Sequence, residues 1–426
     1  MIDDLIARGD VEVAPAPAPL IGSVRPPGSK SITNRALLLA ALAPGRSRIS
    51  GALKSIDTAL MGQALNAMGV TVEEPDAETF IVGSDGRLRP PGAPLFLGNA
   101  GTAMRFLTAA ATLVEGDVVL DGDAHMRKRP IAPLVAALAR SGARISDTGG
   151  CPPVTVAAGH TPRTAGSKDP HLTIDGGLSS QYVSALLMIA PCGRAPQTVE
   201  LTGGEIGARG YIDLTTAAMT AFGADVHQRD ERHWDISPTG YRATEFGVEP
   251  DASAATYLWG AEALTGGRID LGVAPSAFTQ PDAKAHDVIA AFPDMPAEID
   301  GSQMQDAVPT LAVLAAFNAR PVRFTGIANL RVKECDRVAA LATELDRIRP
   351  GLGREEGDDL LVASDPALAG QTLPTRIETY ADHRIAMAFA LAGLKIHGIT
   401  ILDPGCTAKT YPGYWSDLDA LGVELR

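Results

Sequence analysis

Residues 27–35 read PGSKSITNR and run directly into the apolar segment ALLLAALA at 36–43. A glycine turn, small hydroxyl side chains and two cations before a helix are typical of an anion-binding loop. The stretch is not a Walker A loop, because that motif needs a glycine six residues before the lysine, where this chain has Val24. The sequence therefore predicts an anion site of another kind at this helix start.

The pattern around this stretch recurs along the chain. Each copy has an Ala- and Leu-rich helix, a Gly or Pro break and a strand of alternating polarity, which is a change from helical to period-two spacing. The apolar stretches begin at Ala36, Phe106, Leu186, Tyr257, Leu311 and Ala388. A second helix and strand follow most copies, although the pattern is weak after Asp282 and after Lys333. Four glycines stand where a helix is expected to end, since glycine is common just after a helix C-terminus: Gly69, Gly142, Gly223 and Gly422. We predict six α/β units, three in each of two domains that meet near residues 249–250.

Unusual polar residues precede the apolar stretch of every copy. They are Lys30, Ser31 and Arg35, residues 99–105, residues 179–181, residues 249–253, Asp306, and residues 380–384. Helix capping explains the Ser, Asp and Asn side chains. Capping does not explain the cations Lys30, Arg35, Arg105 and Arg384, because positive charge opposes the helix dipole at an N-terminus. We therefore expect several helix starts to share one strongly anionic ligand in a common cleft.

Composition excludes several classes of protein. A net charge of −13 over 426 residues argues against a nucleic-acid partner, which needs a basic face. No apolar run reaches the roughly 18 residues of a membrane helix, and the acidic start MIDDLIARGD differs from a secretory signal. The four cysteines form no CxxC pair and the histidines form no H-E-x-x-H motif. We expect a cytoplasmic protein without a metal or cofactor.

Seven motifs, in order from residue 27 to residue 412, resemble the 3-phosphoshikimate 1-carboxyvinyltransferases (EPSP synthases) of the enolpyruvyl transferase family. They are PGSKSITNRALLLAAL (27–42), LGNAGTAMRFL (97–107), RKRPIAPLVAAL (127–138), SSQYVSALLMIAP (179–191), NLRVKECDR (329–337), YADHRIAMAFALAGL (380–394) and DPGCTAKTYP (403–412). The resemblance implies an inside-out α/β barrel in two domains, with three βαββαβ units in each and helix N-termini facing an interdomain cleft. The implied domains are 27–248, on the shikimate 3-phosphate side, and 1–26 plus 249–426, on the phosphoenolpyruvate side.

The resemblance also implies the reaction and its residues. Phosphoenolpyruvate would give its enolpyruvyl group to the 5-hydroxyl of shikimate 3-phosphate, through a tetrahedral ketal and with release of phosphate, as a step of aromatic amino acid biosynthesis. Shikimate 3-phosphate would be bound by Lys30, Ser31, Arg35, Ser179, Ser180, Gln181, Tyr211, Asp306, Asn329 and Lys333. Phosphoenolpyruvate would be bound by Lys30, Gly101, Arg129, Gln181, Arg337, Arg384 and Lys409. The hypothesised acid–base groups are Asp306 at the hydroxyl and Glu334 at the methylene, with Lys30 assisting. A monomer is expected.

Three departures from the family pattern bear on these roles. Ala208 lacks the hydroxyl that is usual there, and Arg209 is a candidate to replace its phosphate contact. Phe106 stands where proline is common and could reshape the adjacent phosphoenolpyruvate pocket; Gly405 stands where lysine is common. Because Gly101 is retained, we expect glyphosate to compete with phosphoenolpyruvate. The alternatives are an enolpyruvyl transferase that acts on a UDP-sugar and a non-catalytic anion-binding relative.

Overall fold

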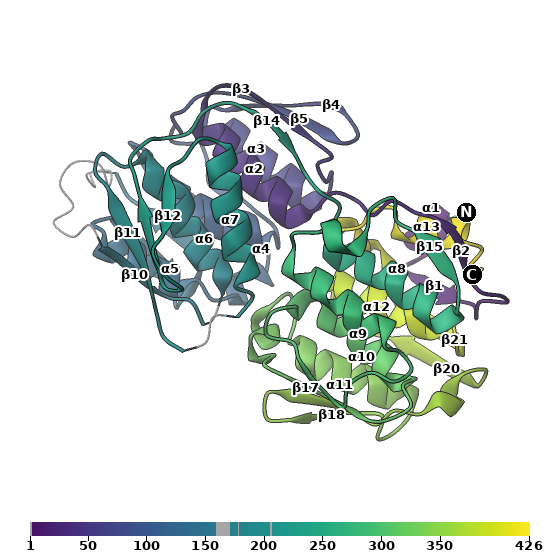
Figure 1. The fold of residues 1–426 in the computed structure, drawn as a ribbon. Helices are drawn as coiled ribbons and strands as arrows, with labels where there is room; N and C mark the ends of the chain where they lie inside the picture. The colour runs from purple at the N-terminus through teal and green to yellow at the C-terminus, as the bar shows by residue number, and fades with distance from the viewer. Residues whose placement is uncertain (1, 159–170, 178, 205–206) are drawn as a thin grey trace. The chain divides into compact units, whose positions relative to one another are not determined.

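The computed structural model describes residues 2–158, 171–177, 179–204 and 207–426 (Figure 1). The chain divides into two compact units, one residue from the boundaries that the sequence suggested. We call Gly28–Glu249 the central unit, and Met1–Pro27 with Pro250–Arg426 the terminal unit. Within the described residues, no helix is both long and apolar enough to cross a lipid bilayer.

The described part of the central unit forms three four-stranded sheets, each with two helices. The first sheet contains β3 (Pro44–Ser50), β4 (Thr71–Asp76), β5 (Thr79–Asp85) and β14 (Glu245–Gly247), with α2 (Lys30–Leu42) and α3 (Ile56–Ala67). The second contains β6 (Leu95–Phe96), β7 (Val118–Asp121), β8 (Ile145–Thr148) and β9 (Cys151–Val156), with α4 (Gly101–Ala111) and α5 (Ala132–Arg140). The third contains β10 (His171–Asp175), β11 (Gln197–Thr202), β12 (Val226–Gln228) and β13 (His233–Ile236), with α6 (Ser180–Ile189) and α7 (Gly210–Ala221). Short 3₁₀ turns are η1 (Met126–Lys128) and η2 (Ala190–Cys192).

All three sheets repeat one topology. Their strand orders are β14-β3-β5-β4, β6-β7-β9-β8 and β10-β11-β13-β12. In each, the first pair is parallel and the other two pairs are antiparallel. A parallel pair requires a crossover, which is the buried first helix of the copy, α4 or α6, in the second and third sheets. In the first sheet, α2 precedes β3, and the parallel partner β14 comes from the end of the unit. The repeat that the sequence pattern predicted is confirmed.

The terminal unit carries the same design in a less regular form. One sheet is complete, with β16 (Glu298–Asp300), β17 (Val322–Thr325), β18 (Gly353–Glu356), β19 (Asp359–Val362), α10 (Val308–Ala316) and α11 (Arg337–Ile348). Another has β2 (Ile21–Ser23) and β15 (Arg268–Asp270), with α8 (Ala252–Thr265) and α9 (Ala285–Ala290). The third has β1 (Asp10–Val13), β20 (Thr372–Ile377) and β21 (His397–Leu402), with α12 (His383–Gly393) and α13 (Tyr414–Ala420). The remaining elements are α1 (Ile2–Arg8), η3 (Pro275–Ala277), η4 (Pro281–Lys284), η5 (Gln305–Ala307), η6 (Ala328–Val332), η7 (Pro366–Leu368) and η8 (Pro404–Lys409).

The complete copy lies where the sequence pattern was weak, after Lys333. There α11 and the β18–β19 hairpin are fully formed. The strands of this hairpin have four residues each, and β18 (GREE) is polar after its glycine, so they give little alternation to detect. The weak sequence pattern therefore reflects these short strands, and the repeat copy itself has all of its strands and helices.

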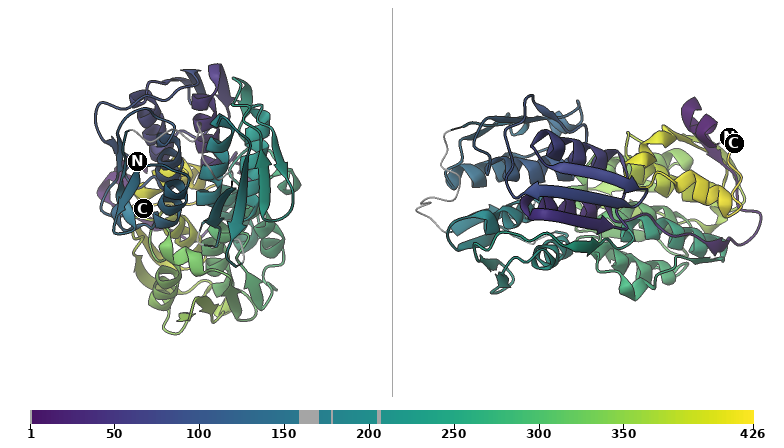
Figure 2. Two further views of the ribbon diagram at one scale, coloured as in Figure 1. Left: turned by 90° about the vertical axis from the view of Figure 1, so that its left-hand side faces the viewer. Right: turned by 90° about the horizontal axis from the view of Figure 1, so that it is seen from above.

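The first helix of each copy forms the core of its unit. All eleven residues of α4, all nine of α10 and all eleven of α12 are buried. A helix that is apolar on every side is a buried helix, and the many alanines allow close packing. Helix α4 packs on α2 and α6, and α8, α10 and α12 pack on one another. Within each unit the strands lie outside these helices (Figures 1 and 2), which confirms the inside-out architecture unit by unit.

The helices begin earlier than their apolar stretches suggest. Ser29, Ser179, Asp251 and Asp382 each accept a backbone N–H as N-caps of α2, α6, α8 and α12. Arg35 was expected before its helix, and it lies inside α2 instead. The reason is that capping residues set the helix start, whereas the apolar pattern marks only the segment that enters the core. The predicted C-terminal glycines Gly69, Gly142, Gly223 and Gly422 all have φ between +85° and +97°.

Candidate active site

The start of α2 places a buried lysine beside a buried aspartate. Lys30 is the first residue of the helix, and its Nζ lies 3.4 Å from Oδ2 of Asp57 on α3. The two side chains are 11% and 3% exposed. A buried cation beside a buried carboxylate is held in a defined position. Sequence inspection missed Asp57, because it lies 27 positions after Lys30 and resembles an ordinary first-turn acid.

Arg35 is buried and links α2, on which it lies, to α6 and α7 of the central unit by hydrogen bonds. Its Nε donates to Oγ1 of Thr215 at 2.7 Å, and its Nη2 donates to Oγ of Ser184 and to the carbonyl of Tyr211. Its Nη1 donates to the carbonyl of Ser31 at 2.8 Å. These partners are neutral, and burial lowers the pKa of Arg35 to about 10. The arginine therefore sits where an anion would stabilise it.

The start of α4 is packed against an arginine. A Cβ built on Gly101 would lie 2.7–2.8 Å from the guanidinium atoms of Arg129, closer than real contacts allow. Arg129 follows η1, is 7% exposed, and donates from Nη1 to Oδ1 of Asn99 at 2.9 Å. Arg105 donates to the carbonyls of Gly101 and Pro130, which adjoin this contact on both sides. Glycine at position 101 is thus what allows Arg129 to lie over the N-terminus of α4.

The start of α6 also carries predicted ligands. Ser179 caps the helix by accepting the N–H of Gln181 at 3.2 Å, and Ser180 is buried as its first residue. The Gln181 amide lies 3.4 Å from Oγ1 of Thr102 on α4. Tyr211, on α7, has its ring 5.7 Å from the Arg35 guanidinium carbon. The structure thus links the starts of α4 and α6 within the central unit.

The structure shows the surroundings of two departures from the family pattern. Phe106 is fully buried on α4, with its ring centroid 5.2 Å from the guanidinium carbon of Arg35, so its contact is with a predicted shikimate 3-phosphate residue. Ala208 adopts a left-handed backbone with φ of 54°. Arg209 donates to the carbonyl of Glu231 at 2.6 Å and lies over the Trp234 ring, which holds its guanidinium by the β13 hairpin.

In the terminal unit, Asp306 is held between two arginines. Its Oδ1 accepts from Nη1 of Arg337 at 3.0 Å, and its Oδ2 accepts from Nη2 of Arg384 at 2.7 Å. Burial alone would raise the pKa of Asp306, but the charges of Arg384, Lys333 and Arg337 outweigh it, and the pKa lies well below its ordinary value. Asp306 is therefore a carboxylate whose basicity is suppressed by the cations around it.

Arg337 is the centre of this group. Its side chain is 2% exposed and contacts Asp306, Glu334 and Asp382. Burial would lower the pKa of Arg337, and the charges of Asp382, Glu334 and Asp306 raise it far above its ordinary value. Glu334 in turn lies 3.0 Å from Nζ of Lys409, at the end of η8. Five residues predicted for the site, Asp306, Glu334, Arg337, Arg384 and Lys409, are thus brought into one connected ion cluster.

Asp382 is a component that the sequence did not single out. It is fully buried and accepts from Nε of Arg337 at 2.7 Å and from the N–H of Arg384 at 2.9 Å. It therefore orients both arginines from the N-cap of α12. The sequence signal for it is its place in the motif YADHR, two residues before the predicted ligand Arg384, but helix capping alone accounts for an aspartate there.

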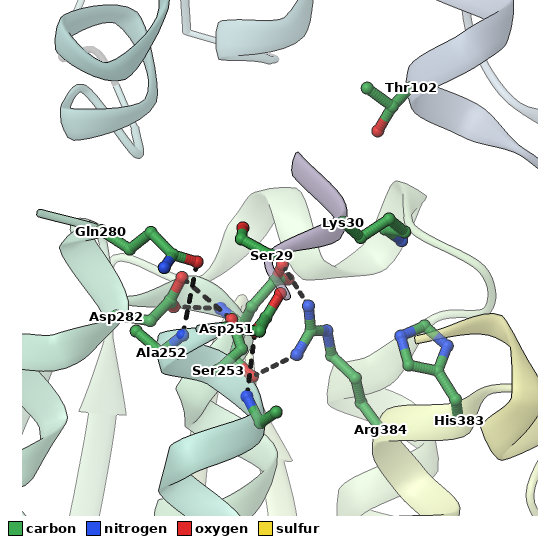
Figure 3. Close-up of polar contacts among 12 residues, drawn as sticks. Ser29, Lys30, Thr102, Asp251, Ala252, Ser253, Gln280, Asp282, His383 and Arg384 are labelled. Carbon is green, nitrogen blue, oxygen red and sulfur yellow. Dashed lines mark hydrogen bonds and ion pairs between the residues drawn. The ribbon is translucent and has the colours of Figure 1, made fainter. Parts of the chain in front are cut away.

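The start of α8 is held by a second buried polar group (Figure 3). Ser253 lies 3.2 Å from Oδ2 of Asp282, the N–H of Ala252 donates to Gln280, and Asp251 caps the helix. The other carboxylate oxygen of Asp282 accepts the N–H of Asp306 at 3.1 Å. Asp282, also missed in the sequence, thus fixes the backbone that carries Asp306.

Two predicted residues lie on or directly after η6. The Oδ1 atom of Asn329 is buried and has no hydrogen-bond partner among the described residues. Lys333 follows four positions later and is half-buried. An amide oxygen without a partner is a costly feature unless a ligand satisfies it. The described residues contain no group of three or more His, Cys, Asp or Glu side chains that could hold a metal ion.

Comparison with known proteins identifies the family. A family model described as EPSP synthase (3-phosphoshikimate 1-carboxyvinyltransferase) matches residues 15–418. The chain is 67% identical over 414 residues to the 3-phosphoshikimate 1-carboxyvinyltransferase of Rhizobium leguminosarum bv. trifolii, and the match covers 97% of each chain. It is 64% identical over 419 residues to the protein of that name from Pseudomonas syringae pv. syringae, covering 98% of this chain and 99% of the other. The solved EPSP synthase of Acinetobacter baumannii shares the fold, with 24% identity, a TM-score of 0.77 and coverage of 98% and 99%. The resemblance stated from the motifs is confirmed: the chain belongs to the EPSP synthase family.

Proposed function

We propose that the chain transfers the enolpyruvyl group of phosphoenolpyruvate to the 5-hydroxyl of shikimate 3-phosphate and releases phosphate. The observation that carries the proposal is the ion cluster of Asp306, Arg337, Arg384, Glu334 and Lys409, which combines cations for a phosphate and a carboxylate with two acids for proton transfer. Family membership over nearly the whole chain supports the same reaction.

In the central unit, the cations that we assign to substrate binding are Lys30, Arg35 and Arg129. Lys30 and Arg129 lie on or beside a helix start, where backbone N–H groups add partial positive charge, and Arg35 lies further inside α2. Arginine donates in pairs and suits the planar carboxylate and the phosphate of these substrates. We assign Ser31, Ser179, Ser180, Gln181 and Tyr211 to shikimate 3-phosphate, and Gly101 to phosphoenolpyruvate.

In the terminal unit, Arg337, Arg384 and Lys409 are assigned to phosphoenolpyruvate, and Asn329 and Lys333 to shikimate 3-phosphate. The existing contacts of these cations with Asp306, Glu334 and Asp382 keep several positive charges close together in a buried site. Anionic substrates would share these cations with the carboxylates. Binding would therefore weaken the hold of Arg337 and Arg384 on Asp306, which raises the pKa of Asp306 toward the range of a useful base.

The chemistry is an addition followed by an elimination. Asp306 takes the proton of the 5-hydroxyl while that oxygen bonds to C2 of phosphoenolpyruvate, and Glu334 protonates C3, which becomes a methyl group. The product of this step is a tetrahedral ketal phosphate. Phosphate then leaves with the electron pair of its C–O bond, and the methyl group returns one proton to Glu334. Lys409 and Lys30 assist by holding charge near the phosphate.

The proposed function is tested by measuring phosphate release from phosphoenolpyruvate with shikimate 3-phosphate, with a UDP-sugar acceptor, or with no acceptor. We expect release only with shikimate 3-phosphate. Release only with the UDP-sugar would overturn the assigned acceptor, and binding of phosphoenolpyruvate without release in any arm would identify a non-catalytic relative.

A methyl group at position 101 is expected to weaken phosphoenolpyruvate binding. In Gly101→Ala, the new Cβ would meet the Arg129 guanidinium at 2.7–2.8 Å, so the arginine must move. A displaced bidentate donor costs about 1–3 kcal/mol, and we expect KM for phosphoenolpyruvate to rise about tenfold or more. Steady-state kinetics with varied phosphoenolpyruvate measures the effect. Gly92→Ala is the matched control, because a Cβ there meets nothing within 4 Å; equal KM values for the two variants would contradict the assignment of Arg129.

A further inference from the structure

We propose that Glu344 and Tyr380 are positioning residues that fix the loop before α12 and thereby the orientation of Asp382 and Arg384. The inference rests on the proposed function, because it assigns a purpose to these two side chains through the phosphoenolpyruvate arginines. Neither residue belongs to the sets assigned above.

The loop at 378–382 has a backbone that needs support. Tyr380 and Ala381 have φ of 56° and 53°, so two consecutive residues with side chains adopt the left-handed region. Residues other than glycine enter this region rarely and singly. The turn brings the N–H of Asp382 to the carbonyl of Thr379 at 2.8 Å and delivers Asp382 to the N-cap of α12.

Glu344 holds this loop through both of its carboxylate oxygens. Its Oε1 accepts the Tyr380 hydroxyl at 2.7 Å, and its Oε2 accepts the N–H of Glu378 at 3.2 Å. The Glu378 carboxylate in turn accepts the N–H of Tyr380 at 3.2 Å. The side chain and the backbone N–H of Tyr380 are thus both held by hydrogen bonds.

Glu344 and Arg337 act on the same segment from one helix. They are seven positions apart on α11, which is close to two helical turns, and so they lie on the same face. Arg337 holds Asp382, at the end of the loop, and Glu344 holds Glu378 and Tyr380, at its beginning. One face of α11 therefore clamps the loop at two points.

Packing alone does not explain a carboxylate at this position. The Glu344 side chain is fully buried, and burial raises its pKa, although the Tyr380 hydroxyl and the Glu378 N–H oppose that rise. Arg347, the cation that lies 3.3 Å from it, is 44% exposed and neutralises it weakly. An apolar residue of similar size would fill the same volume at lower cost. What the carboxylate adds is the two directed hydrogen bonds to the loop.

The first test removes one of these hydrogen bonds. Tyr380→Phe keeps the ring and deletes the hydroxyl that Glu344 accepts. We expect KM for phosphoenolpyruvate to rise about tenfold, close to the lower limit of the value of one hydrogen bond to a charged group, with KM for shikimate 3-phosphate changed less than twofold. Tyr241→Phe is the matched control, because its hydroxyl also makes a 2.7 Å hydrogen bond, to the carbonyl of Met188. The control should lose similar thermal stability while keeping both KM values.

The second test varies the number of acceptor oxygens at position 344. Glu344→Gln keeps one acceptor oxygen for two donors, and Glu344→Ala keeps none. KM for phosphoenolpyruvate should therefore rise in the order wild type, Gln, Ala. If Glu344→Ala fails to fold, Tyr380→Phe and Glu344→Gln still decide the question.

The outcomes separate this inference from the proposed function. Arg384→Ala serves as the reference for the proposed site. A raised KM for phosphoenolpyruvate in Arg384→Ala together with wild-type KM in Tyr380→Phe and Glu344→Gln would overturn the positioning role alone. An unchanged KM in Arg384→Ala would overturn the proposed site, whatever the loop variants do. Equal KM changes in Tyr380→Phe and Tyr241→Phe would show a general loss of stability and would also overturn the positioning role.

Discussion

Replacement of Asp306 with alanine is expected to lower kcat by about 10²–10⁴-fold, the usual contribution of a general base. Binding should behave differently, because Asp306 occupies one guanidinium position on each of Arg337 and Arg384. Without it, both arginines have more capacity for an anionic substrate, so KM for phosphoenolpyruvate should stay constant or fall. Steady-state kinetics separates the two parameters.

The control for this prediction is Asp300→Ala, which removes an aspartate from the same unit. Asp300 accepts hydrogen bonds from the N–H and the hydroxyl of Ser302 in a local turn. It should keep wild-type kcat and KM. A value of kcat within threefold of wild type in Asp306→Ala would contradict the base assignment, and a large rise in KM with unchanged kcat would show that Asp306 only binds substrate.

Replacement of Arg337 with alanine should be the most destabilising change in the ion cluster. The guanidinium is shared by three carboxylates, and Asp382 among them is fully buried. Removal of one partner from a buried ion group leaves uncompensated charge and costs about 3–5 kcal/mol of unfolding free energy. Chemical denaturation should therefore show a large decrease in the midpoint, with activity lost as well.

Arg331→Ala is a matched control for this loss. Arg331 also contacts three carboxylates of the terminal unit, on Asp336, Glu355 and Asp358, but these are 39–61% exposed. Exposed ion pairs contribute about 0–1 kcal/mol each, so its midpoint should change much less. Equal losses in the two variants would contradict the view that burial makes Arg337 important.

The Arg337→Ala effect should also depend on pH. Loss of the cation raises the folded-state pKa of Asp306, which Arg337 helps to lower. A carboxyl whose pKa is lowered by folding stabilises the fold above its unfolded pKa, and this stabilisation is lost as pH falls toward the folded pKa. The part of the stability difference that comes from Asp306 should therefore be present at pH 7 and shrink as pH falls below about 4.

The repeated architecture could be predicted because each copy has its own apolar helix and helix-terminal glycine. Gly69 and Gly142, for example, mark the ends of α3 and α5 independently of any distant residue. The start of α2 was placed too late, because Ser29 sets it through a local cap and the apolar pattern does not report caps. Periodicity therefore predicts which segments enter the core better than it predicts where helices begin.

Only part of the candidate site could be predicted, because residues in distinctive motifs give a sequence signal and capping residues do not. Arg337, Arg384 and Lys409 stand in recognisable motifs, and the structure joins them through Asp306 and Glu334. Their other partners are ordinary aspartates at helix starts, such as Asp382, which has a capping role as well. A residue that serves two functions gives no separate sequence signal, so only the three-dimensional contacts reveal the second one.

The most direct test of the addition–elimination account is deuterium incorporation at C3, measured by NMR during turnover in D₂O. Because C3 passes through a methyl group, we predict deuterium in the methylene of the product and, in the presence of shikimate 3-phosphate, in recovered phosphoenolpyruvate. The Glu334→Gln variant should lose most of this incorporation. Product formed at a normal rate with no deuterium at C3 would contradict the proposed chemistry of Asp306 and Glu334.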